Sequence, residues 1–361
     1  MKLVVGNLID ALALPAKIAS KNKNTPILRN IAIRAENGVL SVTAADMYSA
    51  CRTTAEVDAD SFSAVVDPGT LVGILKTFGH DAEIEITAEP TEIRIRSGRA
   101  DLSLPRLPDD AFPSVDIPEP ALMLPHGIDF PYMFRIAAQC AASAKDDRMW
   151  LQCACIDYTA GHIYGTDGIQ LAAMSFPVIE CDIPSPLFIP STALSYISDA
   201  FQNESELHIF NRGLLLRNKK LDIAVKDAAI PGSKQIPLSV YENWKKMQGS
   251  VEAVFEAEEV LSALARLQLL GDSPVLLTLS DGSAEFSSQD TMRGRGVECV
   301  QCLTDGVPEK IAIKFNPALL RGILHSVNQP TFKLFLDTPK APIKITAPDI
   351  SGFFAMLMPV A

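Results

Sequence analysis

The chain has 361 residues, of which 48% are hydrophobic and 21% charged, and its formal net charge is −11. This length and composition indicate two or three folded domains, and no apolar run approaches the ~20 residues that a membrane-spanning helix needs. The acidic balance argues against broad, non-specific adhesion to nucleic acid, because phosphate binding requires a basic face, but it leaves room for a local one.

Residues 1–120 read as one small domain. Apolar residues at helical spacing around Leu8 and Leu12 predict an amphipathic helix, and residues 26–46 predict two strands joined at the Asn37-Gly38 turn. A second helix is expected over residues 70–78, followed by strands in residues 82–104 and a loop over 107–116. The N-terminus is too polar and interrupted for a secretory signal, and the odd number of cysteines, seven, fits reduced thiols. We therefore expect a cytoplasmic protein with no membrane partner.

Residues 121–244 start with a proline-rich linker and a helix over 130–146. Alternating apolar and polar residues on both sides of Thr166-Asp167-Gly168 predict a strand, a turn and a second strand, and Pro190 begins a short amphipathic helix that ends at Phe201. Residues 224–244 are expected to be a second linker.

Residues 245–361 start with a helix over 257–270, whose acidic first turn complements the helix dipole. A second helix is expected after Asn316-Pro317, which form a typical N-cap and N1 pair. The chain ends in a hydrophobic strand and tail.

These three segments repeat one pattern. Turn aspartates and helix-starting prolines recur about every 120 residues, which is the size of a small domain: Asp46, Asp167 and Asp290, with Pro68, Pro190 and Pro317. The sequence thus predicts an α+β chain of three tandem domains, residues 1–120, 121–244 and 245–361. Each has two helices and about eight antiparallel strands, so that six helices are expected.

No catalytic or metal-binding constellation is found. Cys299-x-x-Cys302 lacks a second pair or paired histidines and favours a strand over a zinc site, and Cys153-x-Cys155 places both thiols on one face of a strand, which favours core packing. The repeated aspartates are read as turn caps. We expect no enzyme activity, metal or cofactor, and interpret the five histidines as surface or loop residues: His80, His126, His162, His208 and His325.

An ordered set of features covering the whole chain resembles the bacterial DNA polymerase III beta subunit, the sliding clamp. It consists of the three half-duplicated domains, the loop 104–116, the segment 144–148 before Thr166-Asp167-Gly168, and the end in Met358-Pro359-Val360. The resemblance implies a non-catalytic subunit of the DNA polymerase III holoenzyme. It forms a head-to-tail homodimeric ring around double-stranded DNA without regard to sequence, with helices inside and sheets outside.

The ring can be tested against helix dimensions. Six helices about 10 Å apart give a ring about 19 Å across at the helix axes, which is too narrow for a duplex, whereas twelve helices leave a hole near 28 Å. Two copies fit DNA and one does not. The helices that would line the hole carry or adjoin basic residues suited to mobile phosphate contact: Lys17, Lys21, Lys23, Lys76, Arg135, Lys145, Arg266 and Arg321. Read without the resemblance, these are ordinary solvated helix faces.

The family also has a hydrophobic pocket that receives short motifs from the DNA polymerase III alpha subunit, the clamp loader and other partners. By position it maps to Arg148, Leu151, Thr166, Gly168, Ile169, Gln170, Leu171, Pro231, Ile236, Met356, Met358, Pro359 and Val360. The chain departs from the family where Ile169 and Gln170 replace a common His-Arg pair, where Gln235 replaces a basic residue, and at Val360-Ala361. Motif preference is therefore open, as is whether this is a chromosomal or a mobile-element copy.

The resemblance places the ring interface between the last strand of the first domain, with Leu102 and Leu104, and the third domain near Leu269 and Leu270. Apolar pairs there would cover an otherwise open strand edge. An alternative is an acidic three-repeat scaffold that binds protein partners but not DNA. The clamp interpretation requires a mass near twice 39.0 kDa in solution.

Overall fold

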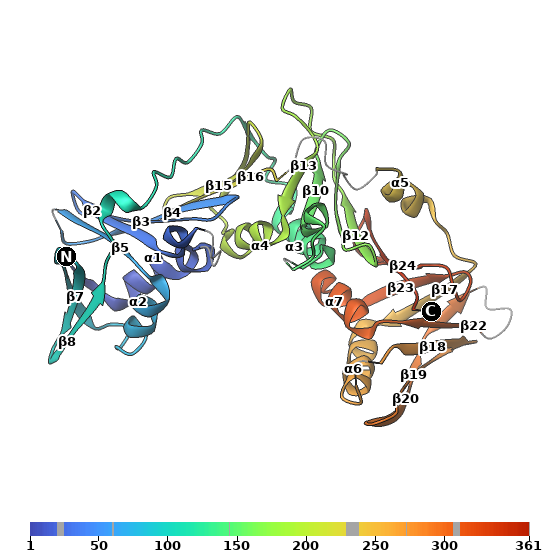
Figure 1. Ribbon diagram of the computed structural model, residues 1–361. Coiled ribbons are helices and arrows are strands. Elements are labelled where there is room, and N and C mark those ends of the chain that lie inside the picture. The colour runs from blue at the N-terminus through green and yellow to red at the C-terminus, as the bar shows by residue number, and fades with distance from the viewer. Residues whose placement is uncertain are drawn as a thin grey trace. The chain divides into compact units, whose positions relative to one another are not determined.

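The computed structural model (Figure 1) describes residues 1–19, 25–59, 61–143, 145–228, 238–271, 273–305 and 311–360. The chain separates into two compact units. Unit 1 contains Met1–Gly127 and Tyr196–Asp227, and unit 2 contains Ile128–Ser195 and Ala228–Ala361. The middle third of the chain is thus shared between the units.

Unit 1 has two antiparallel sheets covered by α1 (Val5–Ile18) and α2 (Pro68–Leu75), with the second half of α4 (Ser191–Ala200). The four-stranded sheet has the order β1 (Lys2–Val4), β6 (Glu83–Ala88), β7 (Glu92–Ser97), β8 (Ala100–Pro105). The eight-stranded sheet has the order β5 (Ser61–Val66), β2 (Ile31–Glu36), β3 (Val39–Ala45), β4 (Ser49–Glu56), β16 (Leu221–Lys226), β15 (Gly213–Asn218), β14 (Glu206–Phe210), β9 (Leu122–Met123).

Unit 2 also has two antiparallel sheets. Its helices are α3 (Phe130–Cys140), α5 (Leu238–Lys246), α6 (Ala257–Gln268) and α7 (Pro317–Val327). The nine-stranded sheet has the order β13 (Leu187–Pro190), β10 (Cys153–Asp157), β11 (His162–Thr166), β12 (Gln170–Ser175), β25 (Phe353–Leu357), β24 (Ile343–Thr346), β23 (Thr331–Leu336), β17 (Val251–Glu256), β21 (Leu303–Asp305). The four-stranded sheet has the order β20 (Gly294–Gln301), β19 (Ser283–Asp290), β18 (Val275–Ser280), β22 (Ile311–Phe315). Short 3-10 turns cover Pro26–Arg29, Asp109–Ala111 and Met149–Gln152.

Local sequence explains where the elements begin and turn. Asp67 accepts a hydrogen bond from Thr70 N at 2.8 Å and Asn316 accepts one from Ala318 N at 3.0 Å, and a proline follows each of these N-caps. Asn37 and Gly38 have φ values of 52° and 79°, the left-handed pair that a two-residue hairpin turn requires. The predicted cap at Asn316 and the predicted hairpin are confirmed, and the cap at Asp67 places the start of α2 at Pro68 rather than at residue 70.

The three repeated aspartates perform one task. The carboxylate of Asp46 accepts from Tyr48 N and Ser49 N, that of Asp167 from Ile169 N and Gln170 N, and that of Asp290 from Met292 N and Arg293 N. Each side chain thereby closes the turn between the second and third strands of a meander. Their interpretation as turn caps is confirmed.

The third strand of each meander decides how the sheets join. In the described residues, each of α1, α2, α3, α4, α6 and α7 is followed by a three-stranded antiparallel meander, and the meanders end in β4, β8, β12, β16, β20 and β25. Strand β4 pairs with β16 in unit 1, and β12 pairs with β25 in unit 2. The two remaining third strands, β8 and β20, each form the edge of a four-stranded sheet.

Several sequence expectations were wrong. The expected linker over residues 224–244 includes the end of β16 and a further helix, α5, so the described residues contain seven α-helices rather than six. The helix expected over residues 130–146 ends at Cys140. His162 and His208 are instead buried on strands, where His162 stacks on the ring of Tyr241 and His208 pairs with Glu206.

Candidate functional site

The turn at residues 166–170 is held by its own side chains. Both backbone N–H groups after Gly168 point at Asp167, and the buried Gln170 side chain donates to the Asp167 carboxylate at 3.1 Å. Thr166 Oγ1 donates to Gln170 O and accepts from Gly168 N at 3.0 Å. Gly168 has a φ of 92°, which disfavours any side chain there. The turn is therefore rigid without a partner.

The C-terminal tail runs directly beside this turn. Strand β25 pairs with β12, and Leu171 lies opposite Met356. The tail continues the ladder where Met358 N donates to Ile169 O at 2.8 Å, and it turns to β22 where Val360 N donates to Lys314 O at 2.9 Å. Backbone pairing therefore fixes Met358, Pro359 and Val360 at the surface next to Ile169.

Arg148 joins a second loop to the turn. Its guanidinium donates to both carboxylate oxygens of Asp146, at 2.9 and 2.7 Å, and to Asp167 O at 3.2 Å. The hydrogen bond from Arg148 lowers the pKa of Asp146 to about 2. Arg148 O accepts from Leu151 N at 2.8 Å, so the loop also sets the position of Leu151.

Apolar side chains beneath the loops form one cluster. Leu151, Leu171 and Met356 are buried in it, whereas Ile169 is 53% exposed and Met358 and Pro359 are half-buried. The structure brings together most of the predicted pocket, here called the tail surface: Arg148, Leu151, Thr166, Gly168, Ile169, Gln170, Leu171, Met356, Met358, Pro359 and Val360. Pro231 and Ile236 lie outside the described residues. Buried leucines and a methionine below exposed apolar side chains suit an apolar peptide.

The basic residues predicted to face DNA differ in their partners. Lys17 Nζ lies 3.7 Å from Asp199, and Arg266 makes two hydrogen bonds to Glu298 at 2.8 and 2.7 Å. In the part of the chain that the structure describes, four of the predicted cations have no carboxylate partner: Lys76, Arg135, Lys145 and Arg321. Lys21 and Lys23 lie outside the described residues.

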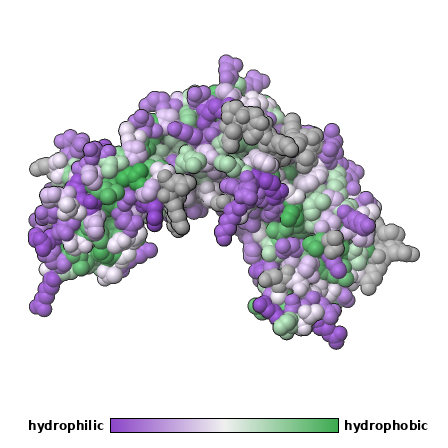
Figure 2. Space-filling view, viewed as in Figure 1, coloured by the Kyte–Doolittle hydropathy of each residue, from purple (hydrophilic) through white to green (hydrophobic). Residues whose placement is uncertain are grey.

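The predicted interface residues lie at the two edge strands. Leu102 on β8 is 38% exposed, while Leu104 on the same strand is buried. Leu269, directly after α6, is 80% exposed, and Leu270 is half-buried beside Gly296 of β20. Figure 2 shows apolar atoms at the surface of the lower end of unit 2, where α6 and β20 lie.

Comparison with known proteins decides the family. Residues 1–116 match the family described as DNA polymerase III beta subunit, N-terminal domain, and residues 247–361 match DNA polymerase III beta subunit, C-terminal domain. The two matches keep the chain order and together cover more than half of the chain. The chain belongs to the DNA polymerase III beta subunit family.

Relatives over the full length carry the same name. A beta sliding clamp of Streptomyces coelicolor is 20% identical over 93% of this chain and 90% of its own length, and one of Pseudomonas aeruginosa is 21% identical over 98% and 97%. Solved beta subunits of Pseudomonas aeruginosa and Thermotoga maritima match all of this chain at TM-scores of 0.82 and 0.83 with 18% identity, covering 99% and 98% of those chains. These likenesses confirm the sliding-clamp fold.

Family membership confirms the resemblance to the beta subunit and the prediction that the chain is not an enzyme. The family is the sliding clamp, a non-catalytic processivity subunit of the polymerase that works as a ring on DNA, so the chain is not an enzyme. Within the described ranges, no group of three metal-ligating side chains was found, and no helix is long and apolar enough to cross a membrane.

Sequence reasoning missed α5, which packs on the apolar cluster beneath the tail surface. Tyr241 is fully buried and its ring stacks on His162 at 4.3 Å, and Trp244, one turn further, is partly buried in the same cluster. Lys344 Nζ donates to two carbonyls at the C-terminal end of α5, Lys245 O in its last turn at 2.9 Å and Met247 O just after it at 2.7 Å. The spacing of Tyr241 and Trp244 was the available signal for this helix.

Proposed function

We propose that two copies of this chain close head to tail into a ring around duplex DNA in the cytoplasm and tether the replicative polymerase to its template. We also propose the three domains 1–120, 121–244 and 245–361 as the repeating units. Membership of the sliding-clamp family supports both proposals, and the arrangement of the meanders supplies the observation that carries the first.

Of the six strands that end a meander, three belong to the first meander of a domain and three to the second. Two strands of each kind pair within the chain, and one of each kind is left at a sheet edge. Strands β4 and β12 come from the first meander of a domain and pair with β16 and β25, which come from the second meander of a domain. By the same rule β20 requires β8. Both are sheet edges with exposed backbone, and such edges invite pairing with another chain. A β8 to β20 junction between copies, repeated twice, closes a ring of two.

The two existing junctions also supply a register. Ser49 and Gln170 each lie three residues after the turn aspartate, and each pairs with the fifth residue of its partner strand, Val225 or Leu357. The turn before β20 is one residue longer, because Gln289, directly before Asp290, pairs with Arg295, whereas Thr166, directly before Asp167, pairs with Leu171. Gly294 therefore takes the place of Gln170 and lies opposite Leu104, the fifth residue of β8. The proposed pairs are Leu104 with Gly294, Ser103 with Arg295, Leu102 with Gly296, Asp101 with Val297, and Ala100 with Glu298.

In this register, inward-facing side chains of β8 lie opposite inward-facing positions of β20, and outward-facing side chains lie opposite outward-facing ones. Gly296 lies under the side chains of Leu267 and Leu270, with 2.7 Å between the Leu270 methyl carbon and the position of a Cβ atom. Leu102 of the second copy would meet these leucines across the junction. Asp101 and Val297 would share the opposite, solvent-facing side. The apolar contact would remove Leu102 and Leu270 from water, which favours association.

The tail surface is the proposed site for partner proteins. Its apolar floor and its backbone-anchored tail suit short apolar segments, and we assign it to the DNA polymerase III alpha subunit, the clamp loader and other proteins with clamp-binding motifs. A Pseudomonas aeruginosa sliding clamp of the same fold has been solved bound to griselimycin. Ile169 and Gln170 leave this rim without the cations common in the family, and Arg148 is paired with Asp146, so partner motifs need not be acidic.

Retention on circular DNA tests the proposal. The chain is loaded onto nicked circular DNA by a competent clamp loader and separated from free protein at moderate salt, before and after the circle is linearised. Retention on the circle with loss on linearisation is expected for a ring. Equal loss from both forms would instead mean ordinary electrostatic binding, and no association at all would favour the scaffold alternative.

A further inference from the structure

The helices that would face DNA carry no net charge. Together α1, α2, α3, α4, α6 and α7 contain four cations and four carboxylates, apart from histidine: Lys17, Arg135, Arg266 and Arg321, against Asp10, Asp199, Glu258 and Glu259. A neutral set of helices provides little general attraction for phosphate. The placement of each cation therefore decides where the duplex is held.

Two of the four cations are neutralised in place. Arg266 is bound through two hydrogen bonds to Glu298, which raises the pKa of Arg266, and Lys17 lies beside Asp199. A phosphate near either ion pair is attracted by the cation and repelled by the carboxylate at a similar distance, so that the net attraction is small. Phosphate binding at Arg266 would also break its two hydrogen bonds to the Glu298 carboxylate, a two-point geometry that favours the carboxylate.

The other two cations lie on one packed helix pair. Helix α3 packs on α7, where Tyr132 OH donates to Val327 O at 2.7 Å and Gln139 lies against Gly322. Arg135 lies between these two contacts on the exposed side of α3, over the ring of Tyr132 at 5.3 Å. The residues that make these two contacts are all uncharged.

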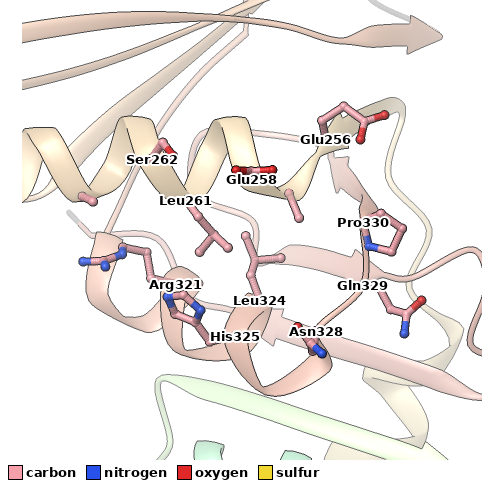
Figure 3. A pocket seen from close by; sticks show the side chains of 12 residues that line it. Glu256, Glu258, Leu261, Ser262, Arg321, Leu324, His325, Asn328, Gln329 and Pro330 are labelled. Carbon is pink, nitrogen blue, oxygen red and sulfur yellow. The ribbon is translucent and has the colours of Figure 1, made fainter.

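Arg321 lines an open cavity of about 510 Å³ between α6 and α7, and His325 follows it one turn later (Figure 3). Arg321 donates to the neutral side chain of Gln268, and its Nε is buried without a partner in the described residues. Glu256 and Glu258 line the other end of the cavity. Glu258 is ten residues from Gln268 along α6, about 15 Å at 1.5 Å per residue. That separation exceeds the screening length of about 8 Å at physiological salt.

We propose that each copy contacts the duplex chiefly through one basic patch, Arg135 on α3 and Arg321 on α7, while α1, α4 and α6 act as a nearly neutral wall. This inference rests on the proposed function. Lys76, at the end of α2, and Lys145, in the loop after α3, also have no carboxylate partner in the described residues but lie outside the two helices, so each adds one separate contact. The partner is the sugar-phosphate backbone of a duplex of any sequence.

Salt dependence of binding to a short fluorescent duplex, measured on the intact two-copy protein, tests the patch. Arg321→Gln and Arg135→Gln should each weaken binding roughly threefold or more at low salt and reduce the slope of log K against log salt by about 1 to 2, since a ring loses one or two phosphate contacts. The matched variants Arg266→Gln and Lys17→Gln remove the same charge from an ion pair and should leave the slope within about 0.3 of the original.

Two results would overturn the patch. One is an equal loss of slope in all four variants, which would mean that the ion pairs open to phosphate. The other is an unchanged slope in Arg321→Gln and Arg135→Gln. Retention of each variant on closed circles separates this failure from failure of the ring itself, because a ring without the patch would still be held by topology. Unchanged mass and thermal unfolding exclude damage to the fold.

Discussion

The closed junctions and the open edges of this molecule are built from the same meander but have opposite surfaces. At the β12 to β25 junction, Leu171 and Met356 are fully buried. At the corresponding positions of the open strands, Ser103 on β8 and Arg295 on β20 are both exposed. The difference indicates that the third strand of each meander is suited to pair with the third strand of another meander. The chain itself forms two of the three such junctions.

The closed junction should be the most sensitive to charge. Leu171→Asp places a carboxylate in the buried cluster between Leu151 and Met356, and it should lower the free energy of unfolding by about 4 kcal/mol. Denaturant unfolding followed by circular dichroism measures this. Ile169→Asp, two residues earlier on an exposed side chain, should change the same quantity by less than about 0.5 kcal/mol. Comparable effects from both would mean that the burial described for Leu171 is wrong.

Charge at the open edge should affect assembly and spare the fold. The double change Leu269→Asp, Leu270→Asp should raise the dissociation constant of the two-copy form at least about a hundredfold, through lost apolar burial and like-charge repulsion. Sedimentation over a concentration series gives this constant. Val178→Asp, at a residue that is 57% exposed and far along the chain from both edges, is the control and should remain as associated as the parent. A persistent two-copy form in the double variant would place the interface elsewhere.

The stabilisation that comes from packing α5 on His162 should decrease as pH falls. Burial lowers the pKa of His162 below its ordinary value; Asp157, Glu242 and Lys245 are the charged groups acting on it. Because the folded state holds the neutral ring, this contribution to stability is complete above the ordinary histidine pKa of about 6.5 and is lost as pH falls below it. The free energy of unfolding should therefore fall between pH 7.5 and 5.5, and His162→Phe should reduce that fall. An identical fall in the variant would exclude His162 as the cause.

The smallest expected effect concerns the end of α5. Lys344→Met removes the donor to Lys245 O and Met247 O, and it should cost about 1 kcal/mol. A loosened helix should also shift the emission of Trp244 to longer wavelength. Lys340→Met, an exposed lysine on the preceding loop, should change neither quantity. A wild-type emission maximum in Lys344→Met would mean that the aromatic contacts alone hold α5.

Local signals explain what could be predicted from the sequence. The turn aspartates act within three residues of themselves, and the N-caps with their following prolines act within one helical turn, so both could be read from spacing. The threefold repeat followed from these signals, because each unit carries the same turn and the same helix start.

Contacts between distant residues could not be predicted in this way. His162 is buried only because Tyr241 from α5 stacks on it, and Arg266 is neutralised only because Glu298 of β20 lies beneath α6. The predicted tail surface came from a resemblance rather than from spacing, and the structure places most of its residues around one cluster. The ion pairs leave no periodic pattern in the sequence, and the spacing of Tyr241 and Trp244 was the one signal noted for α5.

Disulfide trapping of the proposed junction between copies tests the central claim most directly. In a Cys299→Ser background, Ser103→Cys combined with Arg295→Cys places two thiols opposite each other on the solvent face of the β8 to β20 pair. Their Cβ atoms should be about 5 Å apart, within reach of a disulfide. The control combines Ser103→Cys with Val297→Cys, which shifts the pair by two residues to a diagonal of about 7 Å. Rapid formation of a covalent two-chain species by the first pair, and slow formation by the second, is the predicted result. No two-chain species, or equal rates for both pairs, would contradict a ring closed through β8 and β20.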